Sequence, residues 1–209
     1  IGSHLAERLL AEGHRVLVLD NFATGRRENL AGFADHPGLT VETADVADFE
    51  RIRPLFEGKD WVFHLAGLAD IVPSIQRPRD YHAANVDGTI SVLEAARLGG
   101  VRRFLYAASS TCYGLPDVVP TPETAAIRPM FPYALTKYMV EEYALAWHRI
   151  YGLPVVSLRL FNVFGPRSRT SGTYGAVFGV FLAQKLAGKP FTVVGDGTQT
   201  RDFTYVGNA

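Results

Sequence analysis

Short, nearly continuous apolar runs alternate with amphipathic helical patterns along most of this chain. Two of these runs are Arg15–Asp20 (Arg-Val-Leu-Val-Leu-Asp) and Asp60–Leu65 (Asp-Trp-Val-Phe-His-Leu). Strands that are apolar on both faces are typical of parallel sheets, because helices cover both faces of such sheets. The alternation therefore predicts βαβ units and a doubly wound, Rossmann-like parallel α/β sheet.

The same patterns predict the order of the elements. The predicted strands are Arg15–Asp20, Thr40–Thr43, Asp60–Leu65, Arg103–Ala107, Pro154–Leu160, Phe191–Val194 and Asp202–Val206. The predicted helices are Ser3–Glu12, Asp48–Glu57, one or two helices within Pro73–Arg97, Tyr133–Tyr151 and Gly175–Ala187. A stretch rich in Pro and Thr, Leu115–Pro132, is predicted to be a surface loop.

The composition changes to Gly, Ser and Thr after Gly165-Pro166. We therefore expect a nucleotide-binding domain over residues 1–165 and the start of a smaller substrate-binding domain over residues 166–209. The chain begins at Ile1, without Met and inside a helical motif. We expect a fragment that is truncated at both ends, with the first strand of the sheet missing.

Charge and cysteine content narrow the class of protein. Lys and Arg total 21, and Asp and Glu total 21, so the formal net charge is zero. This balance argues against a nucleic-acid partner, which a basic surplus would favour. No apolar run reaches membrane-spanning length, and Cys112 is the single cysteine, so no internal disulfide can form. We expect a cytoplasmic protein.

Two residues near the start fit a dinucleotide site. Gly2 precedes a helix, and Asp20 ends the next predicted strand. In dinucleotide folds the pyrophosphate lies at that helix N-terminus, and an acidic residue at the second strand end binds the adenosine ribose. This favours NAD, although Arg26 and Arg27 could accommodate the extra phosphate of NADP. Gly2 is equally compatible with an ordinary turn, and Asp20 with a turn shared with Asn21.

A tyrosine and a lysine form the candidate catalytic pair. Tyr133 and Lys137 are four residues apart at the start of a helix introduced by Pro132, so they share a face. A lysine ammonium beside a phenol lowers the pKa of the phenol and makes it a usable proton shuttle. A packed Tyr with a surface Lys would produce the same spacing.

Hydroxyl groups follow the predicted strand Arg103–Ala107. Ser109, Ser110 and Thr111 lie at its carboxyl end, where ligands bind to open α/β sheets. Ser109 could hydrogen-bond the substrate oxygen that Tyr133 deprotonates, or these hydroxyls could open a simple Ser/Thr turn. No spacing indicates a metal site, and His64 is predicted to be a core histidine.

The motifs resemble, in order and spacing, the extended short-chain dehydrogenase/reductase family, and most closely its UDP-hexose and UDP-N-acetylhexosamine 4-epimerases. The matching segments are Ile1–Leu5, Leu19–Asn21 with Thr24-Gly25, Ala44–Val46, His64–Gly67, Asn85–Thr89, Ser109-Ser110 with Tyr113-Gly114, Tyr133–Lys137, Arg159–Pro166, and Gly195–Gly197 with Arg201–Phe203. They span almost the whole chain.

The resemblance implies a role for each matching residue. NAD would be bound by Gly2, Asp20, Asn21, Thr24, Gly25, Asp45, Val46, Leu65, Ala66, Gly67, Tyr133, Lys137 and Phe161. The substrate, a nucleotide sugar, would be bound by Ser109, Ser110, Tyr133, Asn162 and Arg201, with Ser109, Tyr133 and Lys137 catalytic. Within this assignment Asn162 and Arg201 would hold the diphosphate, and Asn85 would support the site. A homodimer is also implied.

The resemblance also leaves three reactions to distinguish. Dehydratases of this family carry an Asp-Glu pair directly after the catalytic Ser or Thr, and decarboxylases usually keep a Glu at the second of these positions. This chain has Ser110-Thr111 there. The absence of a carboxylate favours transient oxidation and epimerisation at the sugar C4. A non-catalytic binder of NAD or of a nucleotide sugar is the alternative from another class.

Overall fold

The computed structural model describes residues 1–168, 177–193 and 195–209. The chain forms two compact units, Gly2–Arg159 and Leu160–Ala209 with Ile1. The domain boundary at residue 165 stays a prediction.

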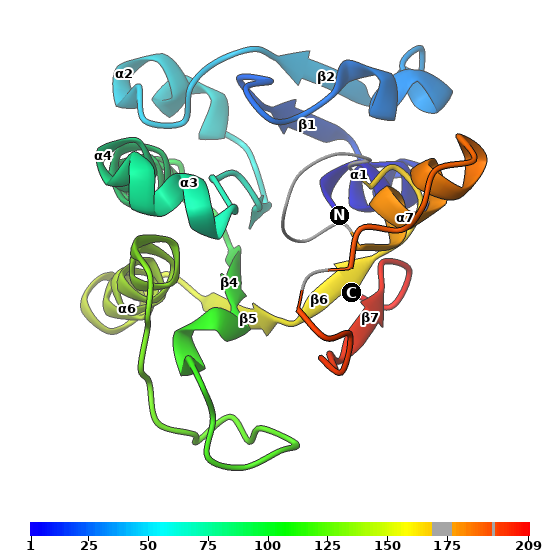
Figure 1. Ribbon diagram of the computed structural model, residues 1–209. Helices are drawn as coiled ribbons and strands as arrows, with labels where there is room; N and C mark the ends of the chain where they lie inside the picture. Colours follow the sequence, from blue (N-terminus) through cyan, green and yellow to red (C-terminus); the bar gives the residue numbers. More distant parts are fainter. Residues whose placement is uncertain (169–176, 194) are drawn as a thin grey trace. The chain divides into compact units, whose positions relative to one another are not determined.

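Five strands form the sheets around which the larger unit is built (Figure 1). Strand β1 (Val16–Leu19) pairs in parallel with β2 (Leu39–Glu42), with Val16 opposite Leu39. Strand β4 (Arg103–Ser109) lies between β3 (Trp61–His64) and β5 (Val155–Leu160), and it pairs with β3 in parallel. The predicted parallel α/β sheet is confirmed.

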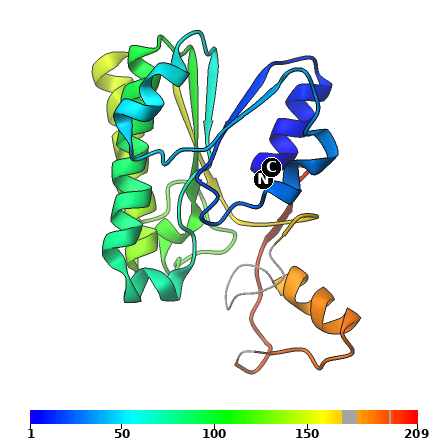
Figure 2. The same ribbon diagram turned by 90° about the horizontal axis from the view of Figure 1, so that it is seen from above.

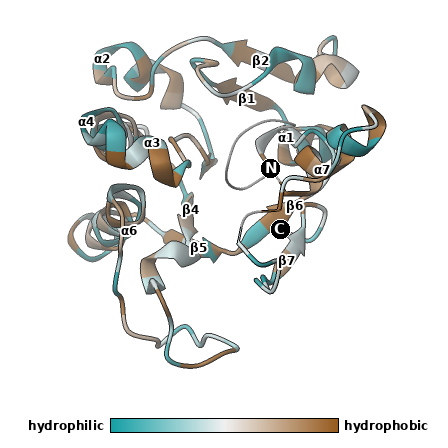
Figure 3. Cartoon of the chain, viewed as in Figure 1, coloured by the Kyte–Doolittle hydropathy of each residue, from teal (hydrophilic) through white to brown (hydrophobic). Residues whose placement is uncertain are grey.

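The helices alternate with these strands as predicted. They are α1 (Gly2–Ala11), α2 (Phe49–Ile52), α3 (Ile71–Gln76), α4 (Pro78–Tyr81), α5 (Gly88–Leu98) and α6 (Pro132–Tyr151). Figure 3 shows hydrophilic and hydrophobic residues together on α4 and α6, as expected for helices with one buried face. A segment for which no element was predicted, Arg27–Phe33, is a 3-10 helix.

Two helical predictions differ from the structure because of proline. Within the predicted helix Asp48–Glu57, the structure has the short helix α2, which is followed by a 3-10 turn over Arg53–Phe56. Pro54 explains the change, since proline has no N–H to continue an α-helical ladder. Pro78 likewise separates α3 from α4, and a π-helical turn, His82–Asp87, connects α4 to α5.

The core lies between the sheet and helices α5 and α6, which cover the same face of β3, β4 and β5 (Figure 2). Phe104 of β4 and Leu93 of α5 are fully buried, and so are Val140 and Ala144 of α6. Alternate residues of β4 point into this core because successive strand side chains face opposite sides. Helix α1 packs on β1, on the other side of the strands.

The smaller unit contains two strands and one described helix. Strand β6 (Asn162–Phe164), which was not predicted, pairs in parallel with β7 (Phe203–Tyr205). Helix α7 (Val177–Leu186) packs Phe178 against the rings of Phe164 and Phe203, with centroid distances of 4.7 and 4.8 Å.

One predicted strand is not formed. Residues Phe191–Val193 are in no strand, and Val194 lies outside the described residues, as do residues 175–176 of the predicted last helix. The side chain of Gln184 explains the local structure, since it bonds both the backbone N–H and the hydroxyl of Thr192. Phe191 also stacks on Phe181 of α7, with ring centroids 4.9 Å apart, so side-chain contacts with α7 hold this segment.

Replacement of Leu93 by Ala should lower the free energy of unfolding by about 2–5 kcal/mol, because Leu93 is fully buried in the core. Chemical denaturation measures this change. Leu98→Ala is the matched control on the same helix, because Leu98 is 51% exposed and its truncation should cost less than about 0.5 kcal/mol. Equal losses in the two variants would contradict the location of the core.

Candidate functional site

The predicted site residues of the larger unit gather where its strands end. Asp20 directly follows β1, Leu65 follows β3, and Ser109 is the last residue of β4. Carboxyl ends of parallel strands meet at one edge of a sheet, which is where open α/β sheets bind ligands. Asp20 stands at the carboxyl end of β1 in the two-stranded sheet, and Leu65 and Ser109 stand at the carboxyl ends of the neighbouring strands β3 and β4 in the three-stranded sheet.

Asp20 is held in a tight turn after β1. Its Oδ1 accepts a hydrogen bond of 2.7 Å from the backbone N–H of Phe22. A Cβ atom at position 25 would lie 2.6 Å from Asp20 Oδ2, so a larger residue there would have to displace this carboxylate. Thr24, in the same turn, is exposed. The turn leaves the carboxylate available at the end of the strand, as a ribose-binding group requires.

Asn21 and Asp45 form the next pair of predicted cofactor residues. Asn21 Nδ2 donates to Asp45 Oδ2 at 3.1 Å, which joins the segments after β1 and β2. Arg27 is engaged beside them, with its guanidinium 4.0 Å from the Phe22 ring centroid and bonded to Thr43 Oγ1 at 2.6 Å. Both of these contacts of the Arg27 guanidinium are with side chains of the protein, Phe22 and Thr43.

The backbone around Gly67 approaches a buried side chain closely. Gly67 has φ +149°, and a Cβ atom there would lie 2.8 Å from Asn85 Oδ1. Asn85, in the π-helical turn, accepts a bond from Leu68 N at 2.7 Å and donates to Leu68 O at 3.1 Å. These contacts fix the segment after β3, where Leu65 and Ala66 are half-buried.

The start of α1 faces the same segment. A Cβ atom at Gly2 would lie 3.4 Å from Leu65 Cδ1, an ordinary van der Waals distance. Gly2 is the first residue of this ten-residue helix and is exposed. The first N–H groups of a helix have no partner within it, so this end suits an anionic ligand.

Three hydroxyl groups form a chain at the end of β4. Tyr133 Oη donates to Ser109 Oγ at 3.4 Å, and Ser109 Oγ lies 2.8 Å from Thr111 Oγ1. Ser110 opens the 3-10 turn that follows Ser109. The structure thus brings together the predicted catalytic residues Ser109 and Tyr133, and it adds Thr111 to them.

A second set of hydrogen bonds fixes the start of α6. Thr136 Oγ1 donates to the carbonyl oxygen of Tyr133 at 2.9 Å and accepts from Asn85 Nδ2 at 3.0 Å. Asn85 therefore joins the loop after β3 to the helix that carries Tyr133. The sequence analysis did not identify Thr136, and only its position between Tyr133 and Lys137 could have drawn attention to it.

Lys137 is buried and lies over an aromatic ring. Its Nζ atom is 4.4 Å from the ring centroid of Tyr106, whose hydroxyl donates to the Lys137 carbonyl oxygen at 3.3 Å. Burial lowers the pKa of Lys137 from 10.5 to about 7. Because the ammonium is costly to bury, this residue changes charge near neutral pH.

The expectation that Lys137 lowers the pKa of Tyr133 is wrong for this structure. Burial raises the pKa of Tyr133, the hydrogen bond to Ser109 lowers it, and the charge of Asp70 raises it. Desolvation outweighs the other effects because the phenolate would lose its hydration. Tyr133 is therefore a proton donor at rest.

His64 confirms its predicted place in the core. It is buried, and its Nε2 atom lies 2.7 Å from Thr89 Oγ1. Burial, together with the charge of Lys137, lowers the pKa of His64 to about 3. Over residues 1–168, 177–193 and 195–209, no cluster of His, Cys, Asp and Glu could hold a metal ion.

The remaining predicted site residues belong to the smaller unit. Phe161 is half-buried, and Asn162 is exposed, with its Nδ2 atom donating to the Asp202 carbonyl oxygen at 2.9 Å. Arg201 is exposed and donates from Nη1 to the Thr200 carbonyl oxygen at 2.6 Å. Asn162 and Arg201 thus lie on adjacent strand segments of one unit, since Arg201 precedes β7 and β6 pairs with β7.

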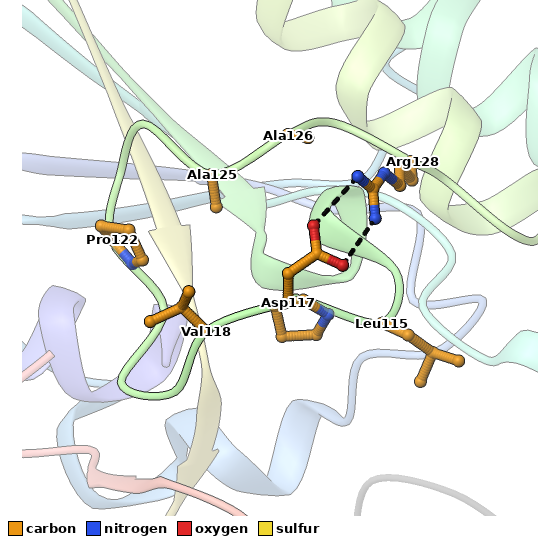
Figure 4. A pocket seen from close by; sticks show the side chains of 8 residues that line it. Leu115, Asp117, Val118, Pro122, Ala125, Ala126 and Arg128 are labelled. Atoms are coloured by element: carbon orange, nitrogen blue, oxygen red, sulfur yellow. Dashed lines mark hydrogen bonds and ion pairs between the residues drawn. The ribbon is translucent and has the colours of Figure 1, made fainter.

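A small pocket of about 100 Å³ lies in the loop that follows the Ser110–Tyr113 turn (Figure 4). Its lining includes Leu115, Val118 and Pro122, and a paired Asp117 and Arg128 with two N–O distances of 3.0 Å. The lining of this pocket contains none of the predicted site residues.

In the parts of the chain that the structure describes, no helix is long and apolar enough to cross a bilayer.

The chain is similar to known proteins along almost its whole length. Residues 1–209 match the model of the NAD dependent epimerase/dehydratase family. The UDP-glucose 4-epimerase of Mycolicibacterium smegmatis is 37% identical over 99% of this chain and 66% of its own length. The UDP-N-acetyl-alpha-D-glucosaminuronate decarboxylase of Bacillus cytotoxicus is 35% identical over 100% of this chain and 65% of its own.

A solved structure is similar over the same extent. It is the UDP-N-acetylglucosamine 4-epimerase from Methanobrevibacter ruminantium M1 in complex with UDP-N-acetylmuramic acid. Its TM-score is 0.93 with 36% sequence identity, and the match covers 98% of this chain and 65% of that one. The chain therefore spans about two thirds of the length of the proteins that it resembles.

Lys137→Met should stabilise the protein at neutral pH and remove part of its pH dependence. Between pH 7 and 10.5 the unfolded chain holds the Lys137 proton more tightly than the folded chain, so stability rises with pH in this window. Methionine has no proton to lose, and it should raise the free energy of unfolding at pH 7 by about 1–4 kcal/mol.

Denaturation at several pH values from 7 to 10 measures this effect. Lys189→Met is the control because Lys189 is exposed. If the wild-type protein and Lys137→Met show the same slope of stability with pH, the buried charge is not the cause.

Proposed function

Because the chain belongs to the NAD dependent epimerase/dehydratase family, we propose that it epimerises a nucleotide sugar at C4 through a transient 4-keto sugar. The substrate is a UDP-hexose or a UDP-N-acetylhexosamine. The observation that carries this proposal is the hydroxyl chain from Tyr133 to Ser109, with buried Lys137 one turn further along α6. A protein that only binds nucleotide sugars needs no such proton path.

NAD is the cofactor of this family, and the residues at the strand ends fit it. Asp20 suits the adenosine ribose hydroxyls, because its carboxylate stands against a glycine and accepts one backbone bond. In this proposal Asn21 also binds the adenosine ribose, and Asp45 and Val46 bind the adenine. The helix that begins at Gly2 offers its first N–H groups to the pyrophosphate. NAD supplies a hydride acceptor, and then a hydride donor, for the sugar C4.

Tyr133 moves the proton of the sugar 4-hydroxyl. Its phenolate accepts this proton during oxidation at C4 and returns it when the keto group is reduced on the other face. Ser109 Oγ, at hydrogen-bond distance from the Tyr133 hydroxyl, holds the same sugar oxygen. Burial raises the pKa of Tyr133, so the phenolate is the minor form and starts the cycle only when it is present. Lys137, one turn further along α6, is proposed to hold the nicotinamide ribose.

The substrate-binding residues of this proposal come from both units, Asn162 and Arg201 from the smaller one and Ser110 from the larger one. Arg201 is suited to a diphosphate because a guanidinium matches phosphate oxygens in two-bond geometry. Asn162 adds an amide donor for the same diphosphate. Ser110 adds a hydroxyl at the sugar, and Phe161 adds an apolar wall for the nicotinamide.

We propose that the whole protein works in the cytoplasm as a homodimer.

The segment after Ser109 supports epimerisation over the two sister reactions. Ser110 and Thr111 stand where dehydratases carry an Asp-Glu pair, and Thr111 Oγ1 is bonded to Ser109 Oγ at 2.8 Å. A hydroxyl in that bond is no general base for removing a proton next to the keto group. The assay must nevertheless identify the product, since decarboxylases are also similar to this chain.

Tyr133→Phe should lower kcat at least about a hundredfold, and Ser109→Ala about a hundredfold, with little change in NAD binding. The measurement is conversion of UDP-glucose and UDP-N-acetylglucosamine to their 4-epimers by the protein in its natural full length. Cofactor-loaded protein that converts neither sugar would contradict the epimerase proposal. A 4-keto-6-deoxy product or release of CO2 would identify a sister reaction instead.

Asp20→Ala should weaken NAD binding about tenfold and NADP binding much less, because the carboxylate favours a ribose with free hydroxyls and repels a ribose phosphate. Titration with both nucleotides, followed by fluorescence, measures the ratio of dissociation constants. Asp35→Ala, also on the exposed surface of the larger unit, is the control. An unchanged ratio in Asp20→Ala would remove this residue from the cofactor site.

A further inference from the structure

Arg159 of β5 connects three segments of the larger unit that meet around the catalytic hydroxyls. Its Nε and Nη2 atoms donate to the carboxylate of Glu141 on α6 at 2.7–3.1 Å. Its Nη1 atom donates to the Tyr113 hydroxyl at 2.8 Å and to the Glu123 carbonyl oxygen at 3.1 Å. A single guanidinium thus joins a strand, a helix, a turn and a loop.

The pair of Arg159 and Glu141 is sheltered from solvent. The Glu141 side chain is 5% exposed and the Arg159 side chain 23%. A buried carboxylate needs such a partner, and the two-bond geometry fixes direction as well as distance. Glu141 lies two turns after Tyr133 on α6, so the position of the pair is linked to the position of the proton-transferring residue.

Tyr113 carries the connection to Ser109. It is the last residue of the 3-10 turn that Ser109 caps, and its ring is buried. Beyond it, Gly114 has φ +62°, and a Cβ atom there would clash with the Arg128 carbonyl oxygen, so the backbone after the turn is closely constrained. Arg159 therefore holds this turn through a hydrogen bond to the Tyr113 hydroxyl and a cation–π contact with its ring, 5.0 Å from the centroid.

We propose that the Tyr113 hydroxyl, held by Arg159, is a positioning group that sets Ser109 against Tyr133 for proton transfer. This inference rests on the proposed function. Tyr113 contacts neither reacting hydroxyl and acts through Ser109. The Ser109–Tyr133 distance of 3.4 Å is long for an O–H···O bond, so a small displacement of the turn breaks it.

Tyr113→Phe tests this role with a minimal change. It keeps the buried ring and the Arg159–Glu141 pair, whereas replacement of either charged partner would leave a buried charge and could unfold the protein. In the natural full-length protein, kcat for the 4-epimerisation should fall about tenfold with an unchanged KM. In a Ser109→Ala background the same change should have no further effect on kcat, because the two residues act in series.

A second measurement does not depend on turnover. With ¹³C-labelled tyrosine, the titration of Tyr133 should move to higher pH in Tyr113→Phe, because the bond from Tyr133 to Ser109 lowers the Tyr133 pKa. Tyr143→Phe is the matched control, since Tyr143 is on α6 and 38% exposed. Its kcat and its Tyr133 titration should match those of the wild-type protein.

The outcomes separate this inference from the proposed function. Wild-type protein without epimerase activity contradicts the proposed function, and the tyrosine titration then still tests the positioning role. An active wild-type protein whose Tyr113→Phe variant keeps its kcat and its Tyr133 titration contradicts the positioning role alone. Additive losses in the Ser109→Ala background would also overturn it, because they would show that Tyr113 acts independently of Ser109.

Discussion

The packing of α6 against β4 is the constraint on which the site depends. This helix buries Ala134, Val140 and Ala144 in the core, and the same face carries Lys137 and Glu141 into the interior. Apolar burial fixes the helix, and the fixed helix then holds charged groups where water cannot reach them. The low pKa of Lys137 follows directly from that packing.

Several buried polar groups near the site have hydrogen-bonding partners. Asn85 is satisfied by the loop after β3 and by Thr136, Arg159 by Glu141, and His64 by Thr89. Such networks are costly when incomplete, so they define one arrangement of the strand ends and helix starts. The proposed proton transfer needs hydroxyl groups at fixed distances, and a fully hydrogen-bonded polar network keeps these distances fixed.

Much of the larger unit could be predicted from the sequence because its signals are local. Buried strands, the helix after Pro132 and the strand-end positions of Asp20 and Ser109 follow from apolar runs and from the rule for parallel sheets. The break at Pro54, the π-helical turn and β6 were missed. Pro54 is a local signal for the break, whereas the π-helical turn depends on how helices adjust to their neighbours. Strand β6 forms only because β7, about 40 residues away, lies beside it.

The sequence by itself determined the fold class and the family, and it predicted the candidate pair Tyr133 and Lys137, because periodicity and motif spacing are properties of neighbouring residues. Only the tertiary structure decided the electrostatics of that pair. Burial, which no motif records, gives Lys137 a pKa of about 7 and raises that of Tyr133. The partners of Arg159 were likewise hidden, because Tyr113, Glu141 and Arg159 meet through folding rather than through spacing.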